Sequence, residues 1–403
     1  MAGSDPSREW LSGNEGVSDS VTAPSTTDQA LLIRAARDFA RAELLERDRE
    51  WDRGKGNVDD VLPTLAEMGL LNIVLPEDTG GLNCDYRTYA SILHEVSYAS
   101  PSTAVTLSVH NMVGHVLHLF APPERREEWL ASWNEVESFG AFAISEAGAG
   151  SDPSASRTRA VLQGDKYVLN GEKMWISNGL RAKWFVTLAR TRPGADKSGL
   201  SMLVVDGASK GVERTPIHGK MGIRGSETAV ISFDEVEVSR ANLLGEEGDG
   251  LAVGLTALNG GRIGIAAQAT GIAEACLDEM LFFATEREQF GEKIANFQAV
   301  QNMIADSAVE LAAAKELIQH AAGLLDARMH DPAASSKAKL CATEAANRIA
   351  YRAVQVHGGM GYVNDCRVEQ LYRDARVTTI YEGTSEIQRI VIARGLLKDV
   401  AVR

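Results

Sequence analysis

A carboxylate followed by a glycine lies near the C-terminal end of the chain. Residues 380–389 read Ile-Tyr-Glu-Gly-Thr-Ser-Glu-Ile-Gln-Arg, so Glu382 sits after Ile380 and Tyr381 and before Gly383. Apolar walls exclude water from a carboxylate, which raises its pKa and makes it a stronger base. Gly383 has no β-carbon and lets a ligand approach the backbone closely. The segment could remove a proton from a weakly acidic carbon, although the dipole of the following helix would also favour an acid here.

Three other segments could hold a cofactor. Residues 142–152 lead from a strand-like stretch into a loop of small residues, which is either an ordinary glycine-rich turn or a cradle for a flat or anionic ligand. Trp175, within residues 171–179, would by default be a core residue of a β-sandwich, or it could lie against a cofactor ring. Arg287 lies between two expected helices and is either a solvated charge or a pyrophosphate ligand.

Composition excludes several classes of function. The 403 residues are 44% hydrophobic and 24% charged, as expected for a soluble globular protein of two or three domains. A formal net charge of -14 disfavours nucleic-acid binding, although local arginines and helix N-termini could still hold a phosphate. No apolar run approaches the roughly 18 residues that cross a bilayer. The protein is therefore expected to have no membrane span.

The four cysteines form no CxxC pair, and no His/Cys cluster has metal-ligand spacing. We therefore expect reduced intracellular thiols and no metal. Residues 1–27 are rich in Ser, Thr and Gly and contain acids, which fits neither a secretory signal nor a transit peptide. They predict a disordered tail on a cytoplasmic protein.

The elements that must position these residues change in kind along the chain. Residues 28–138 have helical periodicity, including 86–98. Residues 139–245 contain strand-like runs, and Asn170-Gly171 between two of them predicts a hairpin turn. In residues 246–403 the stretches 262–284, 299–325 and 332–356 are long, Ala-rich and periodic. The pattern predicts an α+β protein in which a small β-domain separates two helical domains.

Taken together, in this order and at these separations, the four segments resemble the acyl-CoA dehydrogenase family. The resemblance runs from about residue 28 to the C-terminus, and residues 261–266 and 372–389 look most like the short-chain, butyryl-type branch. It implies an N-terminal α-helical domain, a middle antiparallel β-domain and a C-terminal four-helix bundle. It also implies a homotetramer built as a dimer of dimers, with an acyl-CoA substrate and an electron-transfer flavoprotein as electron acceptor.

The resemblance assigns roles to individual residues. Glu382 matches the base that abstracts the α-proton, while hydride passes from Cβ to N5 of FAD to give the trans-2-enoyl-CoA. Substrate-binding positions are matched by Ser151, Arg262, Tyr381 and Gly383. Positions that line or bind FAD are matched by Phe142, Ile144, Ser145, Ser151, Trp175, Ser177, Arg287, Gln289, Phe290, Gln298, Gln355, Gly358, Gly359, Thr384 and Glu386. The group from Arg287 to Gly359 is expected to come largely from a neighbouring subunit.

Gly261 and Ala104 limit which branch of the family the chain can resemble. Some branches of the family place the base directly before the arginine that Arg262 matches, and Gly261 cannot act as a base. Decarboxylating members hold a second carboxylate with an arginine, where this chain has Ala104. The base is therefore expected at Glu382, and a dicarboxyl substrate is disfavoured.

Three alternatives stay open on sequence grounds. The acyl group could ride on a carrier protein instead of CoA. The chain could be a flavin oxidase or monooxygenase on the same fold, which passes electrons to oxygen. It could also be a catalytically silent relative kept for binding, although an intact Glu382, Arg262 and set of FAD motifs argue against this.

Overall fold

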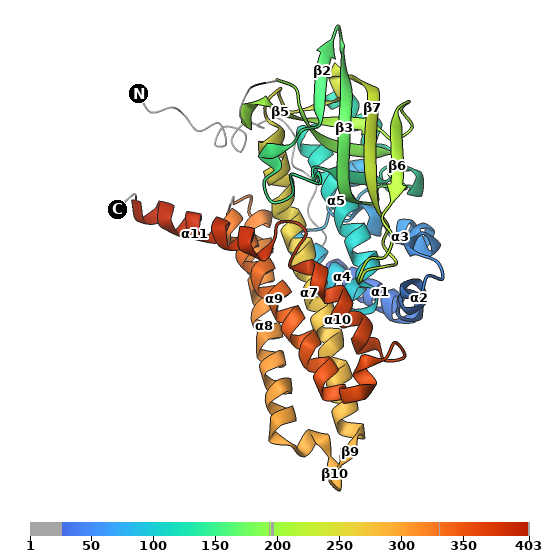
Figure 1. Ribbon diagram of the computed structural model, residues 1–403, viewed down its shortest axis with the longest axis vertical. Coiled ribbons are helices and arrows are strands. Elements are labelled where there is room, and N and C mark those ends of the chain that lie inside the picture. Colours follow the sequence, from blue (N-terminus) through green and yellow to red (C-terminus); the bar gives the residue numbers. More distant parts are fainter. Residues whose placement is uncertain (1–25, 193, 195–196, 330, 402–403) are drawn as a thin grey trace.

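The computed structural model describes residues 26–192, 194, 197–329 and 331–401. Nearly all of the expected N-terminal tail lies outside these residues. Its last two residues, Thr26 and Thr27, instead begin the first helix. The molecule is elongated, with the β-domain at one end and the β9–β10 tip of the helical bundle at the other (Figure 1).

The N-terminal region is helical, as predicted. Asp85 caps α4 by accepting from Thr88 N at 2.8 Å, and Ser100 caps α5 by accepting from Thr103 N at 3.0 Å. Helices α4 and α5 pack against α7 of the C-terminal region, so both regions share one core. The helices are α1 (Thr26–Phe39), α2 (Leu45–Asp52), α3 (Leu62–Glu67), α4 (Tyr86–Ala99), α5 (Pro101–Phe120) and α6 (Pro123–Leu130).

The middle region forms an eight-stranded sheet in the order β6-β7-β3-β2-β4-β5-β8, with β1 paired to β4. Its strands are β1 (Gly140–Ala143), β2 (Arg159–Gln163), β3 (Lys166–Ser177), β4 (Trp184–Arg190), β5 (Leu200–Asp206), β6 (Val212–Pro216), β7 (Thr228–Ser239) and β8 (Leu243–Leu244). The expected antiparallel pairing holds for most neighbours, but β1 and β2 each run parallel to β4. The sheet is therefore mixed. The chain forms β2 and β3 between β1 and β4, and this long connection lets β1 and β4 run in the same direction.

The predicted hairpin at Asn170-Gly171 is wrong, because both residues lie inside the continuous strand β3. A register shift against β7 occurs at this point, and Gly171 has φ 147°. A β-carbon at Gly171 would lie 2.6 Å from Thr158 Oγ1. The Asn170 side chain pairs across the sheet with Glu235, which also has positive φ. The dipeptide thus forms a bulge that bends a long strand.

The C-terminal region is a bundle of α7 (Gly250–Glu286), α8 (Gln298–Asp326), α9 (Pro332–His357) and α10 (Arg367–Thr378), from which α11 (Ser385–Ala401) projects (Figure 1). The three long helices contain the three periodic stretches read from the sequence. Alanines fill the centre of the bundle and allow α7 and α9 to pack closely. Between α7 and α8 the chain makes a two-stranded tip, β9 (Glu288–Gln289) and β10 (Glu292–Lys293).

Candidate active site

Glu382 lies in the tight turn between α10 and α11. Glu382 has φ 52° and Gly383 has φ 88°, so two consecutive residues adopt the left-handed conformation. This conformation costs a residue other than glycine roughly 1 kcal/mol or more, and such outliers gather at functional sites. Ser385 N donates to Thr379 O at 3.0 Å and closes the turn.

The carbonyls of the turn are held by two buried side chains. Gln388 Nε2 donates to the carbonyls of Glu382 and Gly383 at 3.1 and 2.8 Å. Lys339 Nζ, from α9, donates to the Gly383 carbonyl at 2.9 Å. These bonds therefore fix the peptide planes on both sides of Gly383, and a turn held in this way has the preorganisation that an oxyanion site needs.

The carboxylate of Glu382 points into a confined space against α7. Its Oε2 atom is buried and has no hydrogen-bond partner among the described residues. A β-carbon on Gly261 would lie 2.7 Å from this oxygen and 2.8 Å from Met112 Sδ. Burial raises the pKa of Glu382 to about 7, although the charges of Arg262 and Lys339 oppose the rise. A carboxyl group with this pKa is matched to general base work near neutral pH.

Two buried cations flank Glu382. Arg262 is 3% exposed, donates to Asn259 Oδ1 at 3.2 Å, and leaves its Nε without a partner among the described residues. Lys339 is 0% exposed, and burial lowers its pKa to about 8. Arg262 was predicted as a site residue, but Lys339 was not, since a lysine inside an Ala-rich helical pattern is usually solvated.

Tyr381 packs against the apolar cluster that contains Met112. Its hydroxyl hydrogen-bonds to Gln268 Oε1, and Gln268 Nε2 in turn donates to Pro101 O at 2.8 Å. Burial raises the pKa of Tyr381, so the hydroxyl stays protonated. Ile380, by contrast, is 49% exposed in this chain, and Met112 of α5 supplies apolar wall next to the carboxylate instead.

The small-residue loop after β1 is anchored by a buried ion pair. Lys173 is 0% exposed and donates to Glu146 Oε1 at 2.8 Å, to Ile144 O at 3.0 Å and to Ser156 Oγ at 3.0 Å. Glu146 also accepts from Arg157 N and Thr158 N. Sequence reasoning missed this pair, because the two residues are brought together only by the folded sheet. The pair fixes both ends of the loop that contains Ser145 and Ser151.

Trp175 lies at a bulge in β3 and is 58% exposed, so the default interpretation as a core residue does not hold. Its φ of 65° turns the indole out of the strand's alternation. Phe142, Ile144, Ser145 and Ser177 are half-buried, and Ser151 is exposed. The bulge and the anchored loop therefore leave a flat ring and several small polar groups accessible at one end of the sheet.

The remaining predicted cofactor residues lie elsewhere. Arg287, Gln289, Phe290 and Gln298 are exposed around the β9–β10 tip, and Phe290 is 96% exposed. Phe283 stacks on His357 with ring centroids 4.3 Å apart, so the end of α9 and the following glycines lie beside this tip. Figure 1 places the tip at the opposite end of the molecule from β3. Within one chain, the predicted FAD residues thus form two separate groups. Thr384 and Glu386 belong with the Glu382 turn.

Each group suits a different part of FAD. The exposed Trp175 ring and the loop of small residues suit a flat ring system. Arg287 is a cation suited to a pyrophosphate. A β-carbon on Gly358 or Gly359 would meet no atom within 4 Å, so the backbone there is open to close approach. The residues of this chain fit the cofactor, provided that two chains supply them.

A small apolar cavity of about 10 Å³ has Met112 in its wall. Gly260 forms part of its wall, and a β-carbon there would lie 3.0 Å from Tyr86 Oη. Tyr86 packs edge-on against His115 with ring centroids 5.7 Å apart. The residues that line the cavity are Val74, Tyr86, Tyr89, Asn111, Met112, His115, Ala257 and Gly260.

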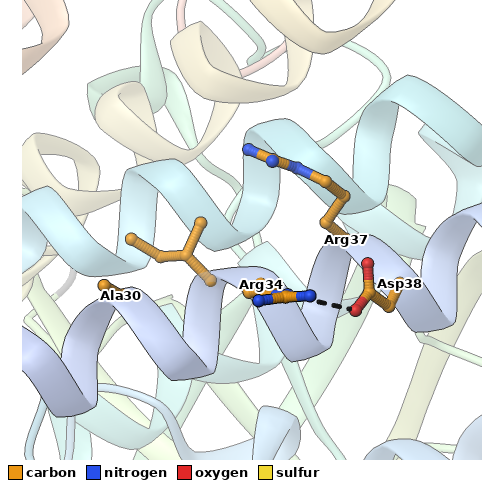
Figure 2. A pocket seen from close by; sticks show the side chains of 5 residues that line it. Ala30, Arg34, Arg37 and Asp38 are labelled. Atoms are coloured by element: carbon orange, nitrogen blue, oxygen red, sulfur yellow. Dashed lines mark ion pairs between the residues drawn. The ribbon is translucent and has the colours of Figure 1, made fainter.

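A larger, shallow hollow of about 620 Å³ lies beside α1 and shares no residue with the predicted site. It is lined by Ala30, Ile33, Arg34, Arg37 and Asp38 (Figure 2). Arg34 pairs with Asp38 at 3.7 Å, and Arg37 pairs with Glu95 at 2.7 Å. Among the described residues no cluster of His, Cys, Asp and Glu is arranged to hold a metal ion. Every helix in the described ranges is too short or too polar to span a bilayer.

The helical, β and helical regions, with a buried carboxylate beside a glycine and two buried cations, have the arrangement of a class of flavin-dependent oxidoreductases. The chain belongs to the acyl-CoA dehydrogenase family. Residues 26–137, 141–236 and 248–397 match the family's N-terminal, middle and C-terminal domains. FAD is its cofactor, and a glutaryl-CoA dehydrogenase of Mycobacterium smegmatis, 26% identical with a TM-score of 0.87 over 92% of this chain and 95% of its own, is in complex with FADH2.

Other relatives bear on the branch of the family. The mitochondrial short-chain specific acyl-CoA dehydrogenase of Mus musculus is 40% identical over 95% of this chain and 93% of its own length. Butyryl-CoA dehydrogenase from Megasphaera elsdenii superposes with a TM-score of 0.89 at 31% identity, over 94% of this chain and all of the other. A chain from a structure of the electron transferring flavoprotein of Acidaminococcus fermentans has a TM-score of 0.90 at 38% identity over 94% of this chain and all of that chain.

Proposed function

We propose that the enzyme dehydrogenates a short-chain acyl-CoA between Cα and Cβ to the trans-2-enoyl-CoA, with Glu382 as the base. The observation that carries this proposal is the buried Oε2 of Glu382, which lies in the space left by Gly261 and has no hydrogen-bond partner in the described part of the chain. A carboxylate oxygen without a hydrogen-bond partner is free to take a proton. Burial keeps its pKa at about 7, so it is basic enough to act and still ionised in part at neutral pH.

Each residue around Glu382 has a separate role in the proton transfer. Glu382 accepts the α-proton on Oε2. The N–H of Glu382, in the turn that Gln388 and Lys339 hold, stabilises the developing charge on the thioester oxygen. Met112 and Tyr381 exclude water from the carboxylate. FAD supplies the acceptor for the hydride that leaves Cβ.

We expect a short tail on the substrate. The apolar cavity that has Met112 in its wall holds only about 10 Å³, which supports this expectation. The likeness to the mouse short-chain enzyme supports the same proposal. We expect butyryl to hexanoyl chains, and the missing side chains at Gly260 and Gly261 leave space for some extension.

We also propose that each FAD is shared by two chains of a tetramer. The separation of the Trp175 group from the Arg287 group within one chain supports this. Exposed apolar side chains around the tip and on α8 and α9 support it as well, for example Phe282, Phe290, Val309 and Tyr351, which are 60–96% exposed. An electron-transfer flavoprotein as electron acceptor is supported by the family resemblance and by the similar chain from the Acidaminococcus fermentans structure.

A chain-length series tests the proposal. Purified FAD-loaded enzyme is mixed with acyl-CoAs of four to sixteen carbons, and bleaching of the oxidised flavin is followed by stopped flow. We expect the fastest bleaching with butyryl- or hexanoyl-CoA. A preference for palmitoyl-CoA or isobutyryl-CoA would overturn the short-chain assignment. Bleaching only by carrier-protein thioesters would instead favour a carrier-bound substrate, and rapid reoxidation of the reduced flavin in air would favour an oxidase.

A further inference from the structure

Lys339 is a fully buried lysine on α9, and nothing in the sequence around it predicts that it is buried. Its ammonium donates to one carbonyl, that of Gly383, at 2.9 Å. A buried ammonium is costly unless it is paired and hydrogen-bonded. Glu382, the neighbour of Gly383, is the acidic residue that most favours its charged form. The lysine therefore belongs electrostatically to the Glu382 turn, although it comes from α9.

Around Glu382, buried positive charges outnumber buried negative charges. Arg262 from α7 and Lys339 from α9 are both buried cations, and Glu382 is the carboxylate between them. Tyr89 from α4 and Tyr381 also face Glu382, but burial raises the pKa of each phenol, so both are neutral. The other acids that influence Lys339 act more weakly than Glu382, and they are Glu344 and Glu386.

We propose that Lys339 is a positioning residue for proton abstraction, an inference that rests on the function proposed above. It holds the Glu382 turn through the Gly383 carbonyl and, with Arg262, gives the pocket a surplus of positive charge. When the α-proton moves to Glu382, the carboxyl group becomes neutral. The electron pair of the broken C–H bond shifts toward the thioester, whose oxygen becomes negative. Both cations then act on the new negative charge.

Binding of a stable anionic analogue separates this role from a merely structural one. Acetoacetyl-CoA can ionise to an enolate, whereas crotonyl-CoA is a neutral enoyl thioester. Affinities of both ligands are measured by calorimetry on FAD-loaded Lys339→Met, which removes donor and charge, and Lys339→Gln, which keeps a donor without charge. Lys337→Met is the matched control, because Lys337 is exposed on the same helix. The enolate fraction is read from ultraviolet absorbance.

We expect both Lys339 variants to bind acetoacetyl-CoA about 10-fold or more weakly, as for losing a unit charge a few Å from an anion in a low-dielectric site, with a lower enolate fraction. Crotonyl-CoA affinity should change less than about 3-fold. The inference is overturned if the ratio of the two affinities is unchanged, whether neither affinity changes or both fall by the same factor. If Lys339→Met does not fold, Lys339→Gln decides alone. A wild-type enzyme that binds neither thioester overturns the proposed function itself.

Discussion

The carboxylate of Glu382 fills the space that a side chain at position 261 would take. A β-carbon on Gly261 would lie 2.7 Å from Glu382 Oε2. The family resemblance implies that some branches place their base at the residue before the matched arginine, which is position 261 in this chain. The two sites for a base are therefore alternatives that compete for one volume, and glycine at 261 is the condition for a base at 382.

We expect Gly261→Ala to slow flavin reduction about 10- to 100-fold, because the carboxylate must leave its position and misplacement by about 1 Å has that cost. Overpacking should also lower the free energy of unfolding by about 1 to 3 kcal/mol. Single-turnover stopped flow and chemical denaturation measure the two effects. Gly260→Ala is the neighbouring control, since its β-carbon would meet Tyr86 Oη at 3.0 Å and should alter tail preference more than the rate with the best substrate. A Gly261→Ala variant as fast as wild type would contradict the packing argument.

Glu382→Gln should fold and bind FAD and acyl-CoA, but an amide cannot take a proton at neutral pH. General bases contribute about 10²- to 10⁴-fold, and the weak acidity of the α-proton places the expected loss at the upper end. The measurement is the rate of flavin bleaching with the best acyl-CoA. Glu213→Gln, on the exposed edge strand β6, serves as a control for removing one negative charge. Bleaching by Glu382→Gln within a few-fold of wild type would show that another group is the base.

The pH dependence follows from the same carboxylate. Burial raises the pKa of Glu382 to about 7, against the opposing charges of Arg262 and Lys339. Since only the ionised form accepts a proton, kcat/KM for flavin reduction should rise as pH increases through about 7 and reach a plateau above it. The free energy of unfolding changes in the opposite direction and falls as pH increases. The folded state binds the proton more tightly than the unfolded chain, so ionisation costs stability between about pH 4.3 and 7. Glu382→Gln should therefore have a higher Tm than wild type at pH 8 and a similar Tm at pH 4.5.

The buried pair of Lys173 and Glu146 should matter for stability and for cofactor retention. Lys173→Met leaves Glu146 without its cation, and breaking a buried pair costs about 3 to 5 kcal/mol. Lys166→Met, on the same strand as Lys173, removes a solvent-exposed pair with Glu237 of β7 and should change the stability little. Urea denaturation of the apoprotein and FAD dissociation in the holoenzyme measure the two consequences. Partial recovery of stability in the double variant with Glu146→Gln is expected, and equal losses for the two lysine variants would argue against the anchor.

Arg287→Ala should weaken FAD binding and subunit association together, because a charge-assisted pair with a pyrophosphate would cross between chains. We expect about a 10-fold or greater rise in the Kd for FAD, together with dissociation at low protein concentration by sedimentation. Arg125→Ala, which removes a half-buried arginine of α6 that pairs with Glu128, is the control. A fully loaded tetramer with unchanged stability would contradict the shared site.

The features that the sequence predicted correctly are those that depend on a local pattern of residues. The long helices α7, α8 and α9 follow from periodicity, and Arg262 and Glu382 lie together as their motifs predict. Contacts between distant segments could not be read in the same way. Lys339 and Lys173 look like ordinary charged residues until the fold buries them. Asn170-Gly171 looked like a turn because nothing local reveals that Thr158 and Glu235 hold it as a bulge.

The wide separation of the Trp175 loop from the β9–β10 tip has a consequence for mixed populations of chains. If each cofactor is shared between two chains, as we propose, a subunit that lacks Arg287 still contributes its own Glu382, and one that lacks Glu382 still supplies its Arg287 to a neighbour. A pair formed from these two defective chains contains one site with both faults and one site with neither. Two inactive alleles could therefore restore activity to each other when their products assemble together, although neither is active alone.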